Sequence, residues 1–209
     1  MVVPQPRETR MIVTKYTADD LKKLPLRAIA AFAARCARRV QDQALLPDDH
    51  PEDQKRRTAV AAAICLAEDF ARDSLCTSFE SVIRNVEESQ TVAEGDFVRD
   101  IAMSAVVQAA RAAGAGLRVL QLRAEPEESH MFGAAKPNPF PHLADVTADL
   151  AAREAFTAAM EAAAATGHAD DFINAGIADY EKLLQLDLGS YPQAGKPIDP
   201  SSNGPLGPL

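Results

Sequence analysis

Alanine dominates this sequence and limits the folds open to it more than any other feature. It fills 40 of the 209 positions, whereas the chain has 8 Phe, 3 Tyr and no Trp. Alanine is the best helix former and loses no side-chain entropy on folding. Because small side chains also let helices approach closely, the composition predicts packed helices and argues against a β-rich fold.

The apolar residues repeat at intervals of three and four, the period of one helix face. This period predicts an all-α fold, an irregular bundle of five or six helices. Thr17 and Asp20 are close to a capping box, so we expect a short helical turn that ends near Leu24. Longer helices are expected at about 25–43, 51–73, 78–92, 146–166 and 169–187, with one more that carries Ile101, Ala105, Ala109 and Ala112.

The end of that additional helix is harder to assign. Gly114 and Gly116 are expected to loosen it. The segment 117–123 that follows has two interpretations: it continues the helix, or it forms a strand paired with residues 11–16.

Prolines and glycines divide the chain into three parts. We expect an N-terminal arm over 1–16, a helical domain over 17–188 and a tail over 189–209. The tail holds five prolines and four glycines and is expected to be extended or disordered. Within the domain, the proline-rich stretch 124–144 is expected to form a long loop.

Charge is polarised along the chain. Residues 1–39 have a net charge of +6, residues 40–123 of −5 and residues 124–209 of −9, which sum to −8. Separated opposite charges either fold onto each other or present one sign to a partner. The negative total argues against nucleic acid as a partner.

Four arginines of the helix expected at 25–43 form the best local constellation: Arg27, Arg35, Arg38 and Arg39. Their offsets place them on one helical side, opposite the apolar residues. Guanidinium groups bind carboxylates or phosphates bidentately, so one interpretation makes these the partner-binding residues of a docking face. That interpretation predicts that charge reversal at Arg35 and Arg38 leaves the fold intact and weakens partner binding. The alternative is an exposed face, or internal pairing with the acidic C-terminal half.

No pattern indicates a catalytic, cofactor-binding or metal-binding site. The acidic run from Asp48 to Asp53 lacks the alternating spacing and the glycine of a calcium loop. Glu127 and His130 make one Glu-x-x-His pair, whereas a di-iron bundle needs two. Phosphate-loop, dinucleotide-binding and nucleophile-elbow signatures are absent. We therefore expect no cofactor.

The sequence also favours a cellular location. No run reaches the roughly 18 apolar residues of a membrane span, and the first residues have no apolar secretory region. Cys36, Cys65 and Cys76 are odd in number and unclustered, which fits a reducing compartment. We expect a cytoplasmic protein without a membrane partner.

A resemblance to a known group covers about residues 30–115. The stretch 33–40 (AARCARRV), Pro47-Asp48-Asp49, and Arg56-Arg57 followed by an alanine-rich helix resemble bacterial helical proteins predicted to be immunity proteins of polymorphic toxins. The resemblance implies an all-helical interaction protein without enzymatic residues.

The leading functional hypothesis is a non-enzymatic module that binds a protein partner, acidic in character, through a charged helical face. An alternative is a small-molecule-binding protein or enzyme whose site lies between the helices and the 124–144 loop, with His130 or His142 as the polar group. A third is a homo-oligomer in which alanine faces pack between subunits.

Overall fold

The computed structural model describes residues 16–74, 78–90, 96–124 and 142–209, and every regular element in these residues is a helix. The all-α prediction is confirmed, with seven α-helices in the described residues where five or six were expected. The elements are α1 (Ala18–Leu21), α2 (Leu26–Arg39), the 3-10 helix η1 (Asp42–Ala44), α3 (Asp53–Ala71), α4 (Phe79–Gln90), α5 (Phe97–Ala124), α6 (Leu143–Ala165) and α7 (Ala169–Gln185).

Local signals account for where several helices begin. The Thr17 Oγ1 accepts a hydrogen bond from the Asp20 backbone N–H at 3.2 Å, and the Asp20 carboxylate accepts one from the Thr17 N–H at 2.9 Å, so the predicted capping box forms. Pro25 immediately precedes α2. α6 begins at Leu143, three residues before the expected start at 146. Most of the predicted 124–144 loop lies outside the described residues.

Helix α5 corrects two expectations about its end. Gly114 and Gly116 do not loosen it, because the helix continues to Ala124. Residues 117–123 are therefore helical and form no strand, while residues 11–15 lie outside the described part of the chain. The glycines instead make room for neighbours: a Cβ at Gly114 would lie 2.6 Å from Ile83 Cδ1, and one at Gly116 would lie 2.5 Å from Phe70 Cε1. They let α4 and α3 pack closely on α5.

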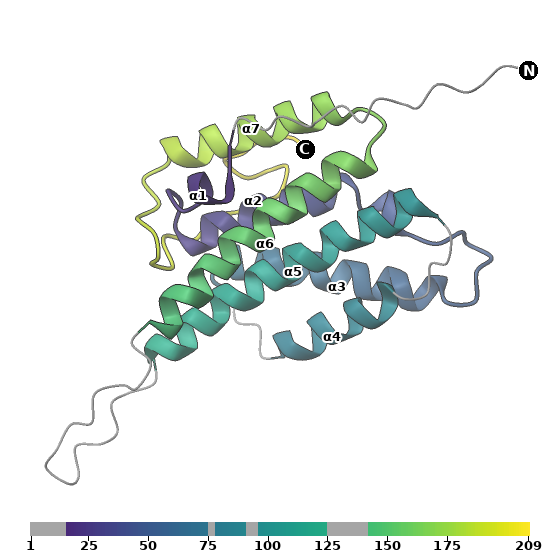
Figure 1. The fold of residues 1–209 in the computed structure, drawn as a ribbon, viewed down its shortest axis with the longest axis horizontal. Helices are drawn as coiled ribbons and strands as arrows, with labels where there is room; N and C mark the ends of the chain where they lie inside the picture. The colour runs from purple at the N-terminus through teal and green to yellow at the C-terminus, as the bar shows by residue number, and fades with distance from the viewer. Residues whose placement is uncertain (1–15, 75–77, 91–95, 125–141) are drawn as a thin grey trace, which may run out of the picture.

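The long helices α5 and α6 lie side by side through the middle of the molecule and make its most extensive helix contact (Figure 1). Alanines form much of this contact, because their small side chains let the two backbones approach. α2 packs against both helices, and its Ile29 and Phe32 are completely buried. α4 lies beside α5 and α3, so α5 is the element between α4 and α6 (Figure 1).

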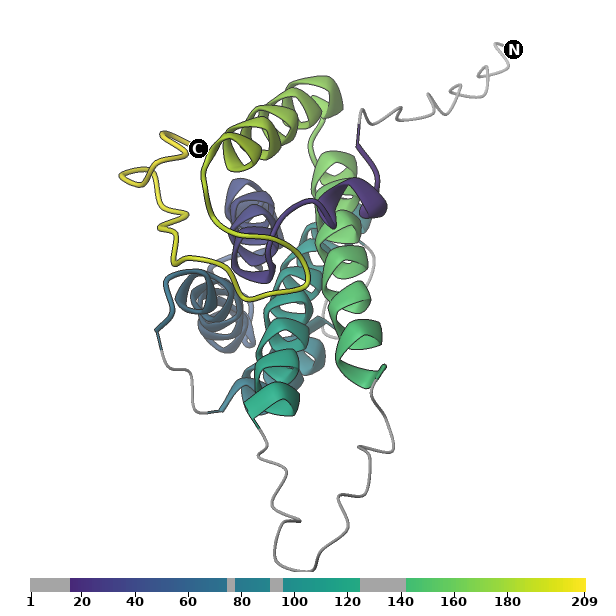
Figure 2. The ribbon, with the colours of Figure 1, turned by 90° about the vertical axis from the view of Figure 1, so that its left-hand side faces the viewer.

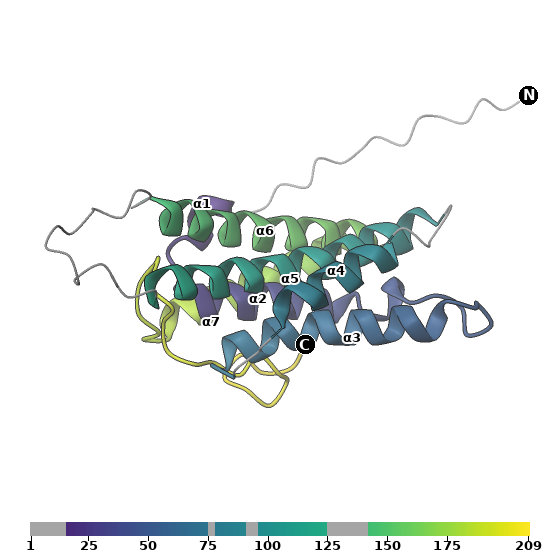
Figure 3. The same cartoon turned by 90° about the horizontal axis from the view of Figure 1, so that it is seen from below.

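The C-terminal segment after α7 lies along the bundle without regular structure (Figure 2). Its Ile198 and Leu206 are buried, and Ile198 donates its N–H to the Ala71 carbonyl at 2.8 Å. The N–H groups of Leu26 and Arg27 donate to residues 193 and 194, each at 2.9 Å. Most of the segment lies on the side of the bundle opposite α6 (Figure 3), and its Tyr191 hydroxyl donates to Asp149 of α6 at 2.5 Å.

Candidate functional site

Arg35, the centre of the predicted docking face, is one of the most deeply buried residues, with 1% of its surface exposed. Its guanidinium donates to Asp179 Oδ2 at 2.8 Å. It also donates to the backbone carbonyls of Pro200 at 3.1 Å, Gly207 at 2.9 Å and Pro208 at 2.8 Å. One side chain of α2 therefore forms hydrogen bonds with both α7 and the C-terminal end of the chain.

The other three arginines are also engaged inside the molecule. Arg39 donates to the same Asp179 oxygen at 2.5 Å, and Arg38 pairs with Glu68 of α3 at 2.5 Å. Arg27 pairs with Asp73 and donates to the Gly195 carbonyl at 2.6 Å.

These contacts agree with the internal-pairing interpretation, in which the basic N-terminal part folds onto acidic groups elsewhere in the chain. The contacts with Asp179 and with the carbonyls of residues 195–208 join α2 to the C-terminal half, whereas Glu68 and Asp73 belong to the middle of the chain. The buried guanidinium of Arg35 presents no charge to an external partner.

The stronger candidate is a groove over α5, with α4 and α6 as its walls. It has a volume of about 440 Å³. Apolar atoms come from Phe79 and Ile83 of α4, Gly114 and Ala115 of α5, and Leu150 of α6, and polar atoms from Glu80, Arg111, Arg118, Thr147 and Glu154. The groove therefore combines an apolar floor with charged edges.

Charges in this groove are unevenly matched. Arg111 donates to Glu87 Oε1 through Nε at 2.9 Å and through Nη2 at 2.7 Å, so its cation is already paired. Glu154 on the opposite wall has neither a hydrogen bond nor an ion pair within the described residues. Burial raises the pKa of the Glu154 carboxyl, Arg111 opposes this rise, and Glu87 adds to it.

Glu161, two turns further along α6, has a similar environment. Burial raises its pKa, a hydrogen bond with Ser104 opposes the rise, and Glu154 adds to it. Glu161 Oε2 and Gln108 Oε1 are buried atoms without a hydrogen-bond partner among the described residues. Arg111 also lowers the pKa of Glu161, as it does that of Glu154, but its guanidinium forms its ion pair with Glu87, so the two half-buried carboxylates share one nearby cation that bonds to neither. A perturbed carboxylate in a cleft is a recognised indication of a functional site.

The N-terminal half of α6 adds exposed apolar surface to the groove. Leu143 is 45%, Val146 63% and Leu150 46% exposed. Positions 143, 146 and 150 share one helix face, which differs from the alanine face packed on α5. Scattered exposed apolar residues are normal, but a continuous group beside a groove is typical of an interaction site.

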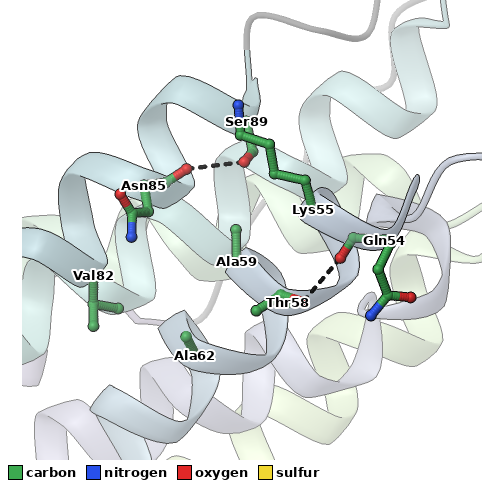
Figure 4. A pocket seen from close by; sticks show the side chains of 8 residues that line it. All are labelled: Gln54, Lys55, Thr58, Ala59, Ala62, Val82, Asn85 and Ser89. Atoms are coloured by element: carbon green, nitrogen blue, oxygen red, sulfur yellow. Dashed lines mark hydrogen bonds between the residues drawn. The ribbon is translucent and has the colours of Figure 1, made fainter. Parts of the chain in front are cut away.

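A second groove lies between α3 and α4 and has a volume of about 490 Å³ (Figure 4). Ala59, Ala62 and Val82 line it, and its hydroxyl groups are already used within their own helices. Thr58 donates to the Gln54 carbonyl and Ser89 to the Asn85 carbonyl, each at 2.9 Å. It contains no unpaired charged group that would select a ligand.

The acidic run and Cys36 have structural roles. Arg57 pairs with Asp48 at 2.5 Å and with Asp53 at 2.6 Å, so the acidic run forms ion pairs at the start of α3. Burial raises the pKa of the Cys36 thiol to about 12, which makes it unreactive. No group of three potential ligands for a metal occurs in the described residues, from which His130 and Cys76 are missing.

Sequence reasoning missed the α6 surface, although the sequence carries a signal for it. Large apolar residues at 143, 146 and 150 fall on a different helical side from the alanines at 148, 152 and 159. When a helix has two apolar faces and packs only one of them into the core, the other can contact a partner. None of the described helices combines the length and apolar character needed to cross a membrane. No family model, curated protein or solved structure matches this chain.

Proposed function

We propose that this chain is a non-enzymatic module that binds a protein partner on the face formed by α4, α5 and α6. The exposed apolar group of Leu143, Val146 and Leu150 beside the groove carries this proposal, because water contact with such a group is unfavourable until a partner covers it. A charged helical face remains part of the hypothesis, but it moves from α2 to α6. An immunity-like or adaptor protein would act in this way, by steric and electrostatic occlusion of its partner.

Affinity capture from the organism that encodes the chain tests the proposal. The bait proteins are the wild type, the double variant Val146→Asp/Leu150→Asp, and Leu184→Asp as the matched control. Leu184 is 45% exposed on α7, so it offers the same substitution at similar exposure on another face. Both variants should keep the circular dichroism spectrum of the wild type, since exposed substitutions away from the core cost little stability.

The expected result is a polypeptide that the wild type and the Leu184→Asp control retain and the double variant loses. If every retained polypeptide binds all three baits equally, the α6 face is not the docking surface and the proposal fails.

A second candidate function is binding of a small molecule near the end of α5. A hollow of about 430 Å³ there is lined by Arg118, Gln121, Leu122, Leu143 and Thr147. These residues flank the segment where the sequence-based alternative placed a ligand site. A metabolite library screened by thermal shift on the wild type and on Arg118→Gln would support this function through a compound that stabilises only the wild type.

A further inference from the structure

Five α6 side chains lie on one side of the helix and form what we call the α6 stripe: Leu143, Val146, Leu150, Glu154 and Glu161. At 100° per residue these positions fall on one side of the helix. The stripe spans about 27 Å at 1.5 Å per residue. Its N-terminal half is apolar and exposed, and its C-terminal half is acidic and partly buried.

Hydrogen-bond acceptors outnumber donors at the acidic end. The Arg111 guanidinium directs two of its nitrogens to one oxygen of Glu87. Glu161 Oε2 and Gln108 Oε1 remain without donors in the described part of the chain. These two atoms are fully buried, whereas the Glu154 carboxylate is partly exposed and has no hydrogen bond or ion pair among the described residues, so a partner's cation could pair with it directly.

On this basis, and given the proposed function, we infer that the partner is an amphipathic helix with two Lys or Arg residues seven positions apart. Its apolar residues cover Leu143, Val146 and Leu150, and its two cations reach Glu154 and Glu161. Seven residues are two helical turns, which matches the spacing of the two carboxylates on α6 when the helices run nearly parallel or antiparallel. A helix laid in a groove is a common mode of peptide recognition.

Other occupants fit the stripe less well. A second copy packed antiparallel along the whole stripe would place Glu154 and Glu161 against Leu143 and Val146, and a parallel copy would bring like charges together. The chain's own segment 125–141 has three Glu, one Lys and four prolines, a composition that suits neither a helix nor an acidic surface.

A phage-displayed library of 18-residue amphipathic helices, selected on the full chain, tests the inference. Selected peptides are expected to carry two basic residues seven positions apart on their apolar side. The best peptide is then titrated by fluorescence anisotropy against the wild type, Glu154→Gln/Glu161→Gln, Val146→Asp/Leu150→Asp and the exposed control Glu181→Gln. We expect both double variants to lose about tenfold or more in affinity, and the control to stay within about twofold.

The outcomes separate this inference from the proposed function. If selected peptides lack the basic pair, the inferred partner chemistry is wrong. It is also wrong if the peptide binds Glu154→Gln/Glu161→Gln as tightly as the wild type but binds Val146→Asp/Leu150→Asp more weakly. In both cases the docking surface itself stands. If neither double variant weakens binding, both are wrong.

Two further measurements address the competing occupants. A dimer in sedimentation velocity that Leu150→Asp dissociates would overturn the inference in favour of a second copy. A tenfold gain in peptide affinity when residues 127–140 are replaced by a Gly/Ser linker would overturn it in favour of the chain's own segment.

Discussion

Replacement of Arg35 by methionine should be among the most damaging single substitutions in this protein. Methionine keeps much of the length and apolar stem of the side chain but removes the guanidinium. Asp179, whose side chain is 3% exposed, would keep only Arg39 as its cationic partner. The carbonyls of Pro200, Gly207 and Pro208 would lose their donor.

The expected cost follows from these contacts. Removing one partner of a buried ion pair costs about 3–5 kcal/mol, because the remaining charge stays desolvated. The three carbonyls can regain water if the C-terminal segment detaches, but detachment exposes Ile198 and Leu206, which are now buried. We therefore expect a loss of about 3–5 kcal/mol in the free energy of unfolding.

Urea unfolding followed by circular dichroism at 222 nm measures this loss. With a slope of about 2 kcal/mol/M, the midpoint should fall by about 1.5–2.5 M. Arg153→Met is the matched control, since Arg153 is exposed on α6, and it should change stability by no more than about 0.5 kcal/mol. Limited proteolysis should also cut the variant after residue 186 sooner than the wild type.

A midpoint for Arg35→Met within 0.3 M of the Arg153→Met control would refute this reasoning. The same contacts reverse the expectation drawn from the sequence alone for charge reversal at Arg35 and Arg38. With Arg35 buried against Asp179, a carboxylate at that position would repel Asp179, so the double reversal should unfold the domain.

Three further predictions follow from individual contacts. Gly116→Ala should lower the midpoint of thermal unfolding. Overpacking against the Phe70 ring costs about 1–3 kcal/mol, which outweighs the roughly 1 kcal/mol gained in helix propensity. An unchanged or raised midpoint would contradict the close packing of α3 on α5. Glu161→Gln should raise stability at pH 7, because the neutral amide avoids the burial penalty of the carboxylate. Its raised pKa means that the folded state holds the proton more tightly, so the penalty grows as pH rises above the ordinary value of 4.5 and the advantage of the variant should vanish below it; urea titrations at pH 4 and pH 7 would show an equal difference if this were wrong. Arg56→Met should cost less than Arg35→Met, about 2 kcal/mol or less, because Arg56 donates only to the carbonyls of Ala44 at 2.6 Å and Ser89 at 3.3 Å and forms no ion pair with the nearby Asp100; urea midpoints in the opposite order would reject this ranking.

The helices were predictable because their signals are local. The period of apolar residues in α2, α3 and α7 and the capping box at Thr17 depend on neighbours within four positions. The expectation that two glycines loosen the end of α5 was wrong for the same reason. Glycine weakens a helix locally, but at Gly114 and Gly116 the packing of Ile83 and Phe70 onto the bare backbone outweighs that weakness.

The internal pairing of the four arginines could not be predicted from their spacing. Helical offsets correctly put Arg27, Arg35, Arg38 and Arg39 on one side of α2, but they carry no information on what covers that side. Segments more than 140 residues away supply Asp179 and the carbonyls of the chain end, which take up Arg35. The groove over α5 likewise depends on α4 and α6 lying on either side of it.

Alanine content and the apolar period were enough to predict a helical, tightly packed chain, because both act through the backbone of each segment. Which charges are paired inside the molecule and which stay exposed depends on the fold. Burial and pairing are properties of groups brought together from distant parts of the chain, so the buried arginines of α2 and the half-buried carboxylates of α6 could be distinguished only in the folded protein.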